Sequence, residues 1–286
     1  MVKFSYIDIH AHLNFSAFDE DREEVIARME NVGIGAINVG TQKDTSAKAV
    51  SLAEAHQNQW AIVGLHPVHT EVGYHTKAEI GVGGSPFNSR GEAFDREYYL
   101  RLARMPKVIG IGECGLDYFH VSKESKEHQA NIFVAHIELA NTLRKPLMLH
   151  IRNGKDSSVD AYEDALTLLR SHAKVPGNVH FFAGSIEQAR SFLNLGFTIS
   201  FTGVITFADS YRELVRFVPL DMMHIETDCP FVAPVPYRGK RNEPSFLPSI
   251  GECVAEIRQN PIEKIQRSLL QNAERLFGIS LEGFEL

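Results

Sequence analysis

Short apolar runs alternate with amphipathic helical patterns along the whole chain of 286 residues, and this alternation restricts the possible folds more than any other feature. Eight runs have the length and composition of buried strands: residues 6–11, 35–40, 60–66, 108–113, 146–151, 178–182, 197–202 and 223–227. Such strands pair in parallel, because each intervening helix returns the chain to the same end of the sheet. We therefore expect a single α/β domain over residues 1–286, a (β/α)₈ or TIM barrel with its active site at the carboxyl ends of the strands.

The segments between these strands have apolar residues three and four positions apart, as helices do. The helices are expected at residues 21–31, 45–58, 94–105, 126–144, 159–173, 185–195 and 209–218, with a C-terminal pair between roughly 249 and 277. An open doubly wound sheet is the alternative, but no glycine-rich phosphate loop follows the first strand. Two long connections stand out: 67–93 is an enlarged loop after the third strand, and 229–246 is a basic, Pro-rich loop after the eighth.

Composition limits the partners and the compartment. The net charge of −7 gives no broad attraction to a polyanion, so a nucleic acid would have to be held by a local basic patch or by metal ions. Neither a signal peptide nor an apolar run of membrane-spanning length is expected, and Cys114, Cys229 and Cys253 form no C-x-x-C pair. We expect a cytoplasmic protein with no membrane contact and no obligate protein partner.

The first strand carries an unusual number of polar residues. Side chains alternate between the two faces of a strand, so Tyr6, Asp8, His10 and His12 are expected on one face. The solvated face of an edge strand would explain this pattern if it stood alone.

Polar residues also end other strands: His66 the third, Glu113 the fourth, His150 the fifth and His180 the sixth, while the eighth runs into Asp228. In a parallel barrel these ends meet at one face. Imidazole and carboxylate are natural ligands of divalent transition metals, and this set supplies more than one ion needs. We therefore predict two divalent ions; the histidines favour zinc, manganese, nickel or cobalt, whereas magnesium prefers oxygen.

Seven segments occur in a recognisable order and at a recognisable spacing: "DIHAHLN", "VGLHP", "IGECGLDY", "PLMLHIRN", "VHFFAGS", "ETDCPFVAP" and "RGKRNEP". They are similar to the motifs of the TatD-like metal-dependent hydrolases, a deoxyribonuclease family of the amidohydrolase superfamily. The chain differs from the family's usual motifs at two places. It has "HFFAG" where H-C-F-[ST]-G is common, and Cys229 where serine is common. Neither change removes a proposed ligand.

The resemblance implies a role for each matching residue. The metal ligands would be His10, His12 and Asp228 for one ion and His150 and His180 for the other, with Glu113 bridging both. The catalytic residues would be Asp228, Glu113 and His66, and the substrate phosphates would face Arg152, Arg238, Lys240 and Arg241. Because a buried carboxylate needs partners, we expect Asp8 to support the ligands from behind as a hydrogen-bond acceptor.

The implied activity is hydrolysis of DNA phosphodiester bonds, with single-stranded or 3′-end DNA as substrate and a metal-bridging hydroxide as nucleophile. An amidohydrolase-type enzyme acting on a small ester, lactone or amide, or on an aminoacyl-tRNA ester, is the alternative. Many such enzymes bridge their metals with a carboxylated lysine on the fourth strand, where this chain has Glu113. A binding protein that has kept the barrel without catalysis is a third possibility, although such proteins usually lose ligands.

Overall fold

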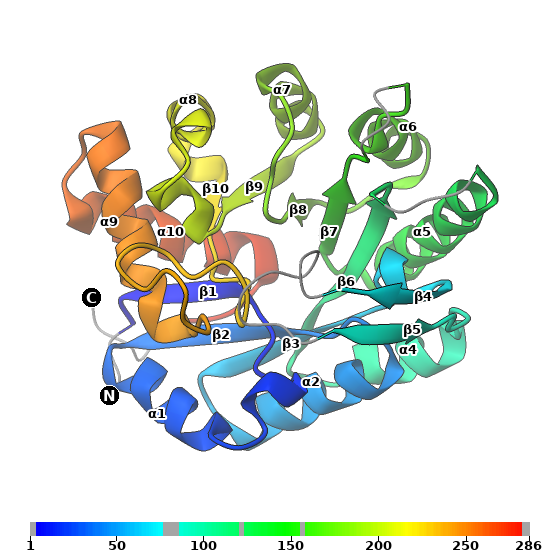
Figure 1. Ribbon diagram of the computed structural model, residues 1–286, viewed down its shortest axis with the longest axis horizontal. Helices are drawn as coiled ribbons and strands as arrows, with labels where there is room; N and C mark the ends of the chain where they lie inside the picture. Colours follow the sequence, from blue (N-terminus) through cyan, green and yellow to red (C-terminus); the bar gives the residue numbers. More distant parts are fainter. Residues whose placement is uncertain (1–3, 77–85, 120–122, 155–157, 282–286) are drawn as a thin grey trace.

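Eight parallel strands form a barrel in the computed structural model, which describes residues 4–76, 86–119, 123–154 and 158–281 (Figure 1). In order around the sheet they are β1 Tyr6–Ala11, β2 Ile34–Val39, β3 Gln59–Val63, β6 Val108–Asp117, β7 Leu147–Arg152, β8 Gly177–Val179, β9 Phe197–Phe201 and β10 Met223–Ile225. The segment after β10 joins β1 through backbone hydrogen bonds from Asp228 N to His10 O, 2.9 Å, and from His12 N to Cys229 O, 3.0 Å. The expected TIM barrel is confirmed.

Helices follow the strands and form the outer layer of the barrel (Figure 1). They are α1 Arg22–Asn31, α2 Lys43–Ala55, α4 Arg96–Ala103, α5 Lys123–Leu143, α6 Ala161–His172, α7 Ile186–Asn194, α8 Arg212–Phe217, α9 Leu247–Arg258 and α10 Ile262–Phe277. Of the helices in the described ranges, none has both the length and the apolar character needed to span a membrane.

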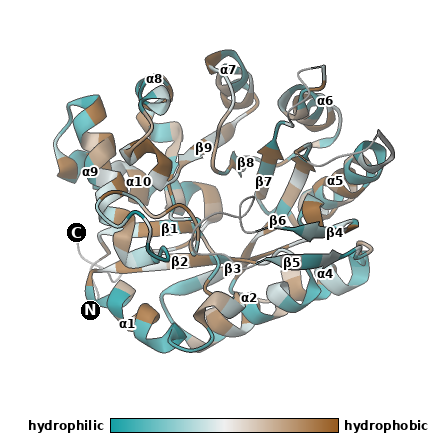
Figure 2. Ribbon diagram, viewed as in Figure 1, coloured by the Kyte–Doolittle hydropathy of each residue, from teal (hydrophilic) through white to brown (hydrophobic). Residues whose placement is uncertain are grey.

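The apolar core has two parts, and the strands carry much of the apolar surface in Figure 2. One part fills the space between the strands and the surrounding helices. The other brings Ile9, Ile62 and Met148 together with α10, which lies at the amino end of β10, where Asn272 donates hydrogen bonds to two backbone carbonyls. The histidines and carboxylates that end the strands lie at the opposite, carboxyl end of the barrel.

The enlarged connection after β3 contains a β-hairpin, which the sequence analysis did not predict. Its strands, β4 Val72–His75 and β5 Phe87–Arg90, pair antiparallel. The glycine- and asparagine-containing sequences VGYH and FNSR lack the apolar alternation that identifies a strand. The residues between them, 77–85, lie outside the described residues.

Strand β1 also differs from the expected alternation. Its pairing with β2 shifts between Asp8 and Ala11, so three steps along β1 match two steps along β2. Tyr6 lies against Gly251 of α9, whereas His10 lies among the strand-end histidines. The expectation that Tyr6, Asp8, His10 and His12 share one face is therefore wrong, because a bulge changes which face later residues occupy.

Candidate metal centre

Glu113 of β6 lies at the centre of the polar cluster, and its two carboxylate oxygens face different partners. Oε2 is 3.4 Å from Nε2 of His10 and 3.8 Å from Nε2 of His12. On this side Asp228 Oδ1 lies 3.4 Å from Nε2 of His12. The other ring nitrogen of His12, Nδ1, is 2.9 Å from the carbonyl oxygen of Val39, which fixes that nitrogen as the donor. When the ring is neutral, Nε2 of His12 therefore carries the lone pair, which points into the cluster.

The other oxygen of Glu113, Oε1, faces three histidines from different strand ends. It lies 2.9 Å from Nε2 of His180, 3.0 Å from Nδ1 of His150 and 3.3 Å from Nε2 of His66. The structure therefore brings together all six residues that the sequence analysis proposed as ligands, with His66 beside them. A ring of strand ends explains this convergence, because the carboxyl ends of a parallel barrel share one face.

Asp117 is a member of the cluster that the sequence analysis missed. Its Oδ2 is 2.9 Å from Nε2 of His150, so this carboxylate and Glu113 hold the two ring nitrogens of one histidine. Gln129 of α5 fixes the backbone of Asp117 through hydrogen bonds to both its N–H and its carbonyl. The available signal was the final aspartate of "IGECGLDY", four residues after Glu113, but the strand was expected to end at 113.

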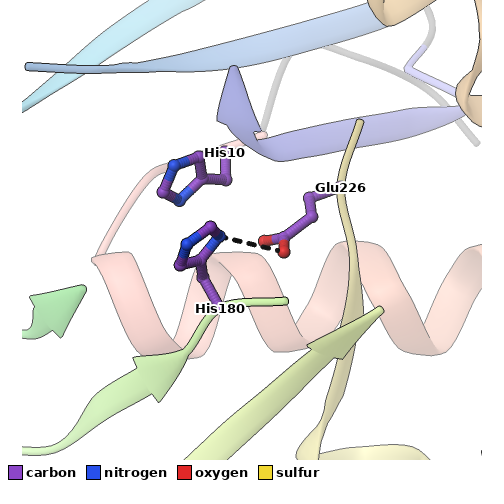
Figure 3. Close-up of side chains that lie close together, drawn as sticks. All are labelled: His10, His180 and Glu226. Carbon is purple, nitrogen blue, oxygen red and sulfur yellow. Dashed lines mark ion pairs between the residues drawn. The ribbon is translucent and has the colours of Figure 1, made fainter. Parts of the chain in front are cut away.

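Glu226 is the second residue that was missed. Its Oε1 lies 3.3 Å from Nδ1 of His180 and accepts a hydrogen bond from Phe181 N, while Oε2 accepts one from the Ser200 hydroxyl. Figure 3 shows this carboxylate pointing toward His180, whose ring stacks on that of His10 at 3.9 Å between centroids. The sequence placed Glu226 inside the expected eighth strand and gave it no role.

Asp8 lies behind the cluster as a hydrogen-bond acceptor. It accepts hydrogen bonds from the backbone N–H of His10 and from both the N–H and the hydroxyl of Thr227. These contacts join β1 to the segment that leads into Asp228. Asp8 therefore touches the backbone that carries the proposed ligands and not their rings.

The protonation of the cluster follows from burial and from the mixture of charges. Burial favours the neutral form of Glu113, but His66, His180 and His10 outweigh it and hold the pKa of Glu113 well below its ordinary value. Burial, together with the nearby His180, lowers the pKa of His10 to about 3. Burial also opposes ionisation of Asp117, yet the hydrogen bond from His150 lowers its pKa to about 2. Burial opposes protonation of His12, His150 and His180, but hydrogen bonds and charges from nearby carboxylates outweigh it and raise the pKa of each ring. Metal ions bind ionised carboxylates and neutral imidazoles, so binding at these three rings would release protons.

The donor set fits divalent cations. Within the described ranges, no lysine or arginine lies within ion-pair distance of Glu113, Asp117, Glu226 or Asp228. Their partners are histidines, which are charged only when protonated. Several buried carboxylates without a permanent cation are costly unless a metal ion compensates them. Three groups of donors lie close enough to hold an ion: His10, His180 and Glu226; His10, His12 and Glu113; and His66, Glu113 and His150.

A cavity of about 1330 Å³ opens over the cluster. Its walls include residues from the strand ends and from both strands of the β4–β5 hairpin. The cations among its lining residues are Lys48, Arg90 and Arg152. Lys48 pairs with Asp19 and Arg90 with Asp44, whereas the Arg152 guanidinium lies 3.9 Å over the ring of Phe119.

The basic loop after β10 is positioned differently from the cavity-lining cations. Arg241 forms an ion pair with Asp21 at 2.6 Å and donates to the carbonyl of Ala17. Arg238 donates to the carbonyl of Ala233, and its guanidinium lies over the ring of Phe207. Neither these two residues nor Lys240 is among the residues that line the cavity, so their contact with substrate stays a prediction.

Comparison with known proteins agrees with this geometry. Residues 7–278 match the family model described as TatD related DNase. The chain belongs to this family. It is 36% identical over 278 residues to the metal-dependent hydrolase YabD of Bacillus subtilis, described as uncharacterized, covering 96% of this chain and 99% of the relative. It is 32% identical over 282 residues to the 3′-5′ ssDNA/RNA exonuclease TatD of Pantoea ananatis, covering 95% and 99%. The protein is therefore a metal-dependent hydrolase of the TatD family.

The fold also matches solved structures of the family. YJJV, a TatD homologue from Escherichia coli, aligns over 98% of this chain and 100% of its own, with a TM-score of 0.80 and 27% identity. A TatD family hydrolase from Entamoeba histolytica aligns with a TM-score of 0.79 over 97% and 99% of the two chains. Its identity is 22%, so this second match concerns the fold alone.

Proposed function

We propose that this hydrolase is a nuclease that cleaves phosphodiester bonds of single-stranded DNA, with two divalent ions held on the two sides of Glu113. The proposal rests on one observation: the two carboxylate oxygens of Glu113 face different sets of histidines. Oε2 faces His10 and His12, and Oε1 faces His66, His150 and His180. A carboxylate that presents one oxygen to each of two donor groups is suited to bridge two ions.

The remaining ligands divide between the same two sides. His10, His12 and Asp228 would hold one ion, and His150 and His180 would hold the other. The histidine-rich donor set favours zinc, manganese, nickel or cobalt over magnesium. Bound ions would polarise the phosphodiester and lower the pKa of the attacking water.

The chain's own groups would handle the proton and the developing charge. The carboxylate of Asp228 lies at the edge of the cluster, where it can accept the proton of the attacking water. His66 lies 3.3 Å from Glu113 and faces the cavity, beside the position of the scissile group. Arg152 is a cation on the cavity wall without a carboxylate partner among the described residues, so its charge is available to a phosphate oxygen.

Three further carboxylates would keep the ligands in position. Asp117 holds His150, Glu226 holds His180, and Asp8 holds the backbone on which His10 lies. A carboxylate on the second nitrogen of a ligand histidine fixes its orientation and raises its basicity.

The proposed substrate is supported by the cavity and by one relative. A cavity of about 1330 Å³ is larger than the usual site for a small molecule, and Lys48, Arg90 and Arg152 line it. The Pantoea ananatis relative is named for action on single-stranded DNA and RNA. A polymer of nucleotides fits these features better than a small ester, lactone or amide.

The test is a substrate panel on the purified protein, with and without a chelator and with each candidate metal added back. We expect hydrolysis of single-stranded DNA that is lost on chelation and restored by metal, and slower hydrolysis of duplex DNA. Turnover of a lactone, an amide or an aminoacyl-tRNA ester, with no turnover of any phosphodiester, would contradict the proposal.

A further inference from the structure

The β4–β5 hairpin presents one face of exposed side chains at the cavity. In its register Val72 lies opposite Arg90 and Tyr74 opposite Asn88. Residues directly opposite each other in an antiparallel pair point to the same face, as do residues two apart on one strand. Val72, Tyr74, Asn88 and Arg90 therefore share one face, which we call the hairpin face. All four line the cavity, as do Gly73, His75 and Ser89 of the opposite face.

The opposite face of the hairpin is tied down by polar contacts. Ser89 is 2% exposed; its hydroxyl donates to the carbonyl of Gly73 and lies 3.2 Å from Nε2 of His75. On the hairpin face, by contrast, Val72 is 81% exposed and Tyr74 is 63% exposed. These contacts hold the two strands of the hairpin together, while the ion pair of Arg90 with Asp44 of α2 joins the hairpin to the barrel.

The exposed apolar side chains of the hairpin face lie where a ligand can reach them. Large apolar side chains exposed at a cavity mark a binding surface more often than a random surface position does. Two other aromatic rings of the cavity wall are already engaged: Phe15 stacks on His12, and Phe231 lies edge-on to Phe15. The Tyr74 ring, with most of its surface in solvent, is well placed to receive a further planar group.

We propose that the hairpin face is a nucleobase-stacking subsite, with the Tyr74 ring as its platform. The inference rests on the proposed nuclease function and specifies how its substrate is held. Every nucleobase has a π-face that an aromatic side chain can stack on without reading sequence. Arg90 lies on the same face in an ion pair with Asp44 at 2.7 Å, so the recognition proposed here rests on the Tyr74 ring.

The subsite makes the enzyme favour a single-stranded polymer over a small diester. A small diester has no neighbouring base to reach the hairpin, so it depends on the metal centre alone. In a duplex the bases are stacked on each other, and their faces are not available to a protein ring. Tyr74 is thus a substrate-positioning residue and takes no part in bond cleavage.

The test compares Tyr74→Ala and Tyr74→Phe with the wild-type protein as purified. Binding is measured by fluorescence anisotropy with a phosphorothioate single-stranded oligodeoxynucleotide, which resists hydrolysis. We expect Tyr74→Ala to raise the dissociation constant roughly 5- to 100-fold. Tyr74→Phe keeps the ring and should bind nearly as the wild type does. Val32→Ala, an exposed apolar position outside the cavity, is the matched control.

A second measurement places the stacked base. A single abasic residue is moved along the oligonucleotide, and each substrate is combined with Tyr74→Ala in a double-mutant cycle. At one position the abasic residue should weaken wild-type binding but leave Tyr74→Ala binding unchanged. Additive effects at every position would overturn the inference even if the variant binds less tightly.

Hydrolysis of bis(p-nitrophenyl) phosphate separates this inference from the proposed function. All variants should hydrolyse this small diester at the wild-type rate. If the wild type cleaves DNA and the small diester, but Tyr74→Ala binds DNA equally well, the subsite is wrong and the nuclease function stands. A wild type that neither binds single strands nor hydrolyses any diester would contradict both.

Discussion

The floor of the cavity, made by the strand-end ligands around Glu113, differs from the hairpin face at its rim. Glu113 is 3% exposed and lies within 3.8 Å of five histidines, whereas Tyr74 is 63% exposed. The floor is assembled by the barrel itself, because its strands deliver the side chains to one ring. The rim comes from one insertion between β3 and α4.

This difference indicates how chemistry and substrate choice are divided. A change on the floor disturbs several buried charges together, because the histidines and carboxylates form one connected network in which Glu113 alone contacts five histidines. A change on the rim removes one contact and leaves the metal centre intact. The following predictions test that division.

Asp117→Asn is expected to have the largest effect of these substitutions. It replaces the carboxylate on His150 by a neutral amide, and loss of such a partner commonly weakens metal affinity 10- to 100-fold. The measurement is competitive metal titration, with the rate at saturating metal as a second readout. Asp164→Asn, which changes a half-exposed carboxylate bonded to Tyr118, is the control. Equal metal affinity in Asp117→Asn and the wild type would show that Asp117 does not position His150.

Arg152→Ala should have a smaller effect that is confined to the substrate. Removing one phosphate contact is expected to weaken oligonucleotide binding roughly 5- to 10-fold. The slope of log affinity against log salt concentration should fall by about 0.7, and metal content should not change. Arg170→Ala removes an exposed arginine outside the cavity and should leave the slope unaltered. An unchanged slope in Arg152→Ala would mean that no phosphate lies against this guanidinium.

Arg241→Ala should have the smallest effect on substrate. Its guanidinium is engaged by Asp21 and the carbonyl of Ala17, so the substitution is expected to lower the free energy of unfolding by about 1 kcal/mol. Oligonucleotide binding should stay at the wild-type level. Chemical denaturation and anisotropy measure the two quantities separately. A loss of binding as large as that of Arg152→Ala would restore the role predicted from the sequence.

The barrel and the main donors were predictable because they depend on periodicity and on position along the strands. Every expected strand was found, and the convergence of the six proposed ligands was predictable because polar residues that end parallel apolar strands meet at one face of a barrel. The β1 bulge was not predictable, because an inserted residue leaves no mark in the apolar pattern. The face assigned to Asp8 failed for that reason, although its role as an acceptor beside His10 agrees with its hydrogen bonds.

The other differences between the sequence analysis and the structure also arise where the sequence carries no clear structural signal. Asp117 lies on the part of β6 beyond residue 113, where Glu113 and Gly115 interrupt the apolar run and suggest that the strand has ended. The β4–β5 hairpin was not predicted because its strands are short and partly polar. The basic loop was assigned to substrate from the resemblance of its motif to that of the family. A motif does not determine where a long side chain points, and Arg241 pairs with a local carboxylate.

The most direct test of the central claim is the metal content of the purified protein and of Glu113→Gln, measured by elemental analysis after dialysis. Glutamine keeps the shape of the side chain but removes the charge and one of the two oxygens that face the histidines. With Glu263→Gln on the surface of α10 as the control, we expect two ions per chain in the wild type and fewer than one in Glu113→Gln. One ion per chain in the wild type, or two ions retained by Glu113→Gln, would contradict a centre bridged by Glu113.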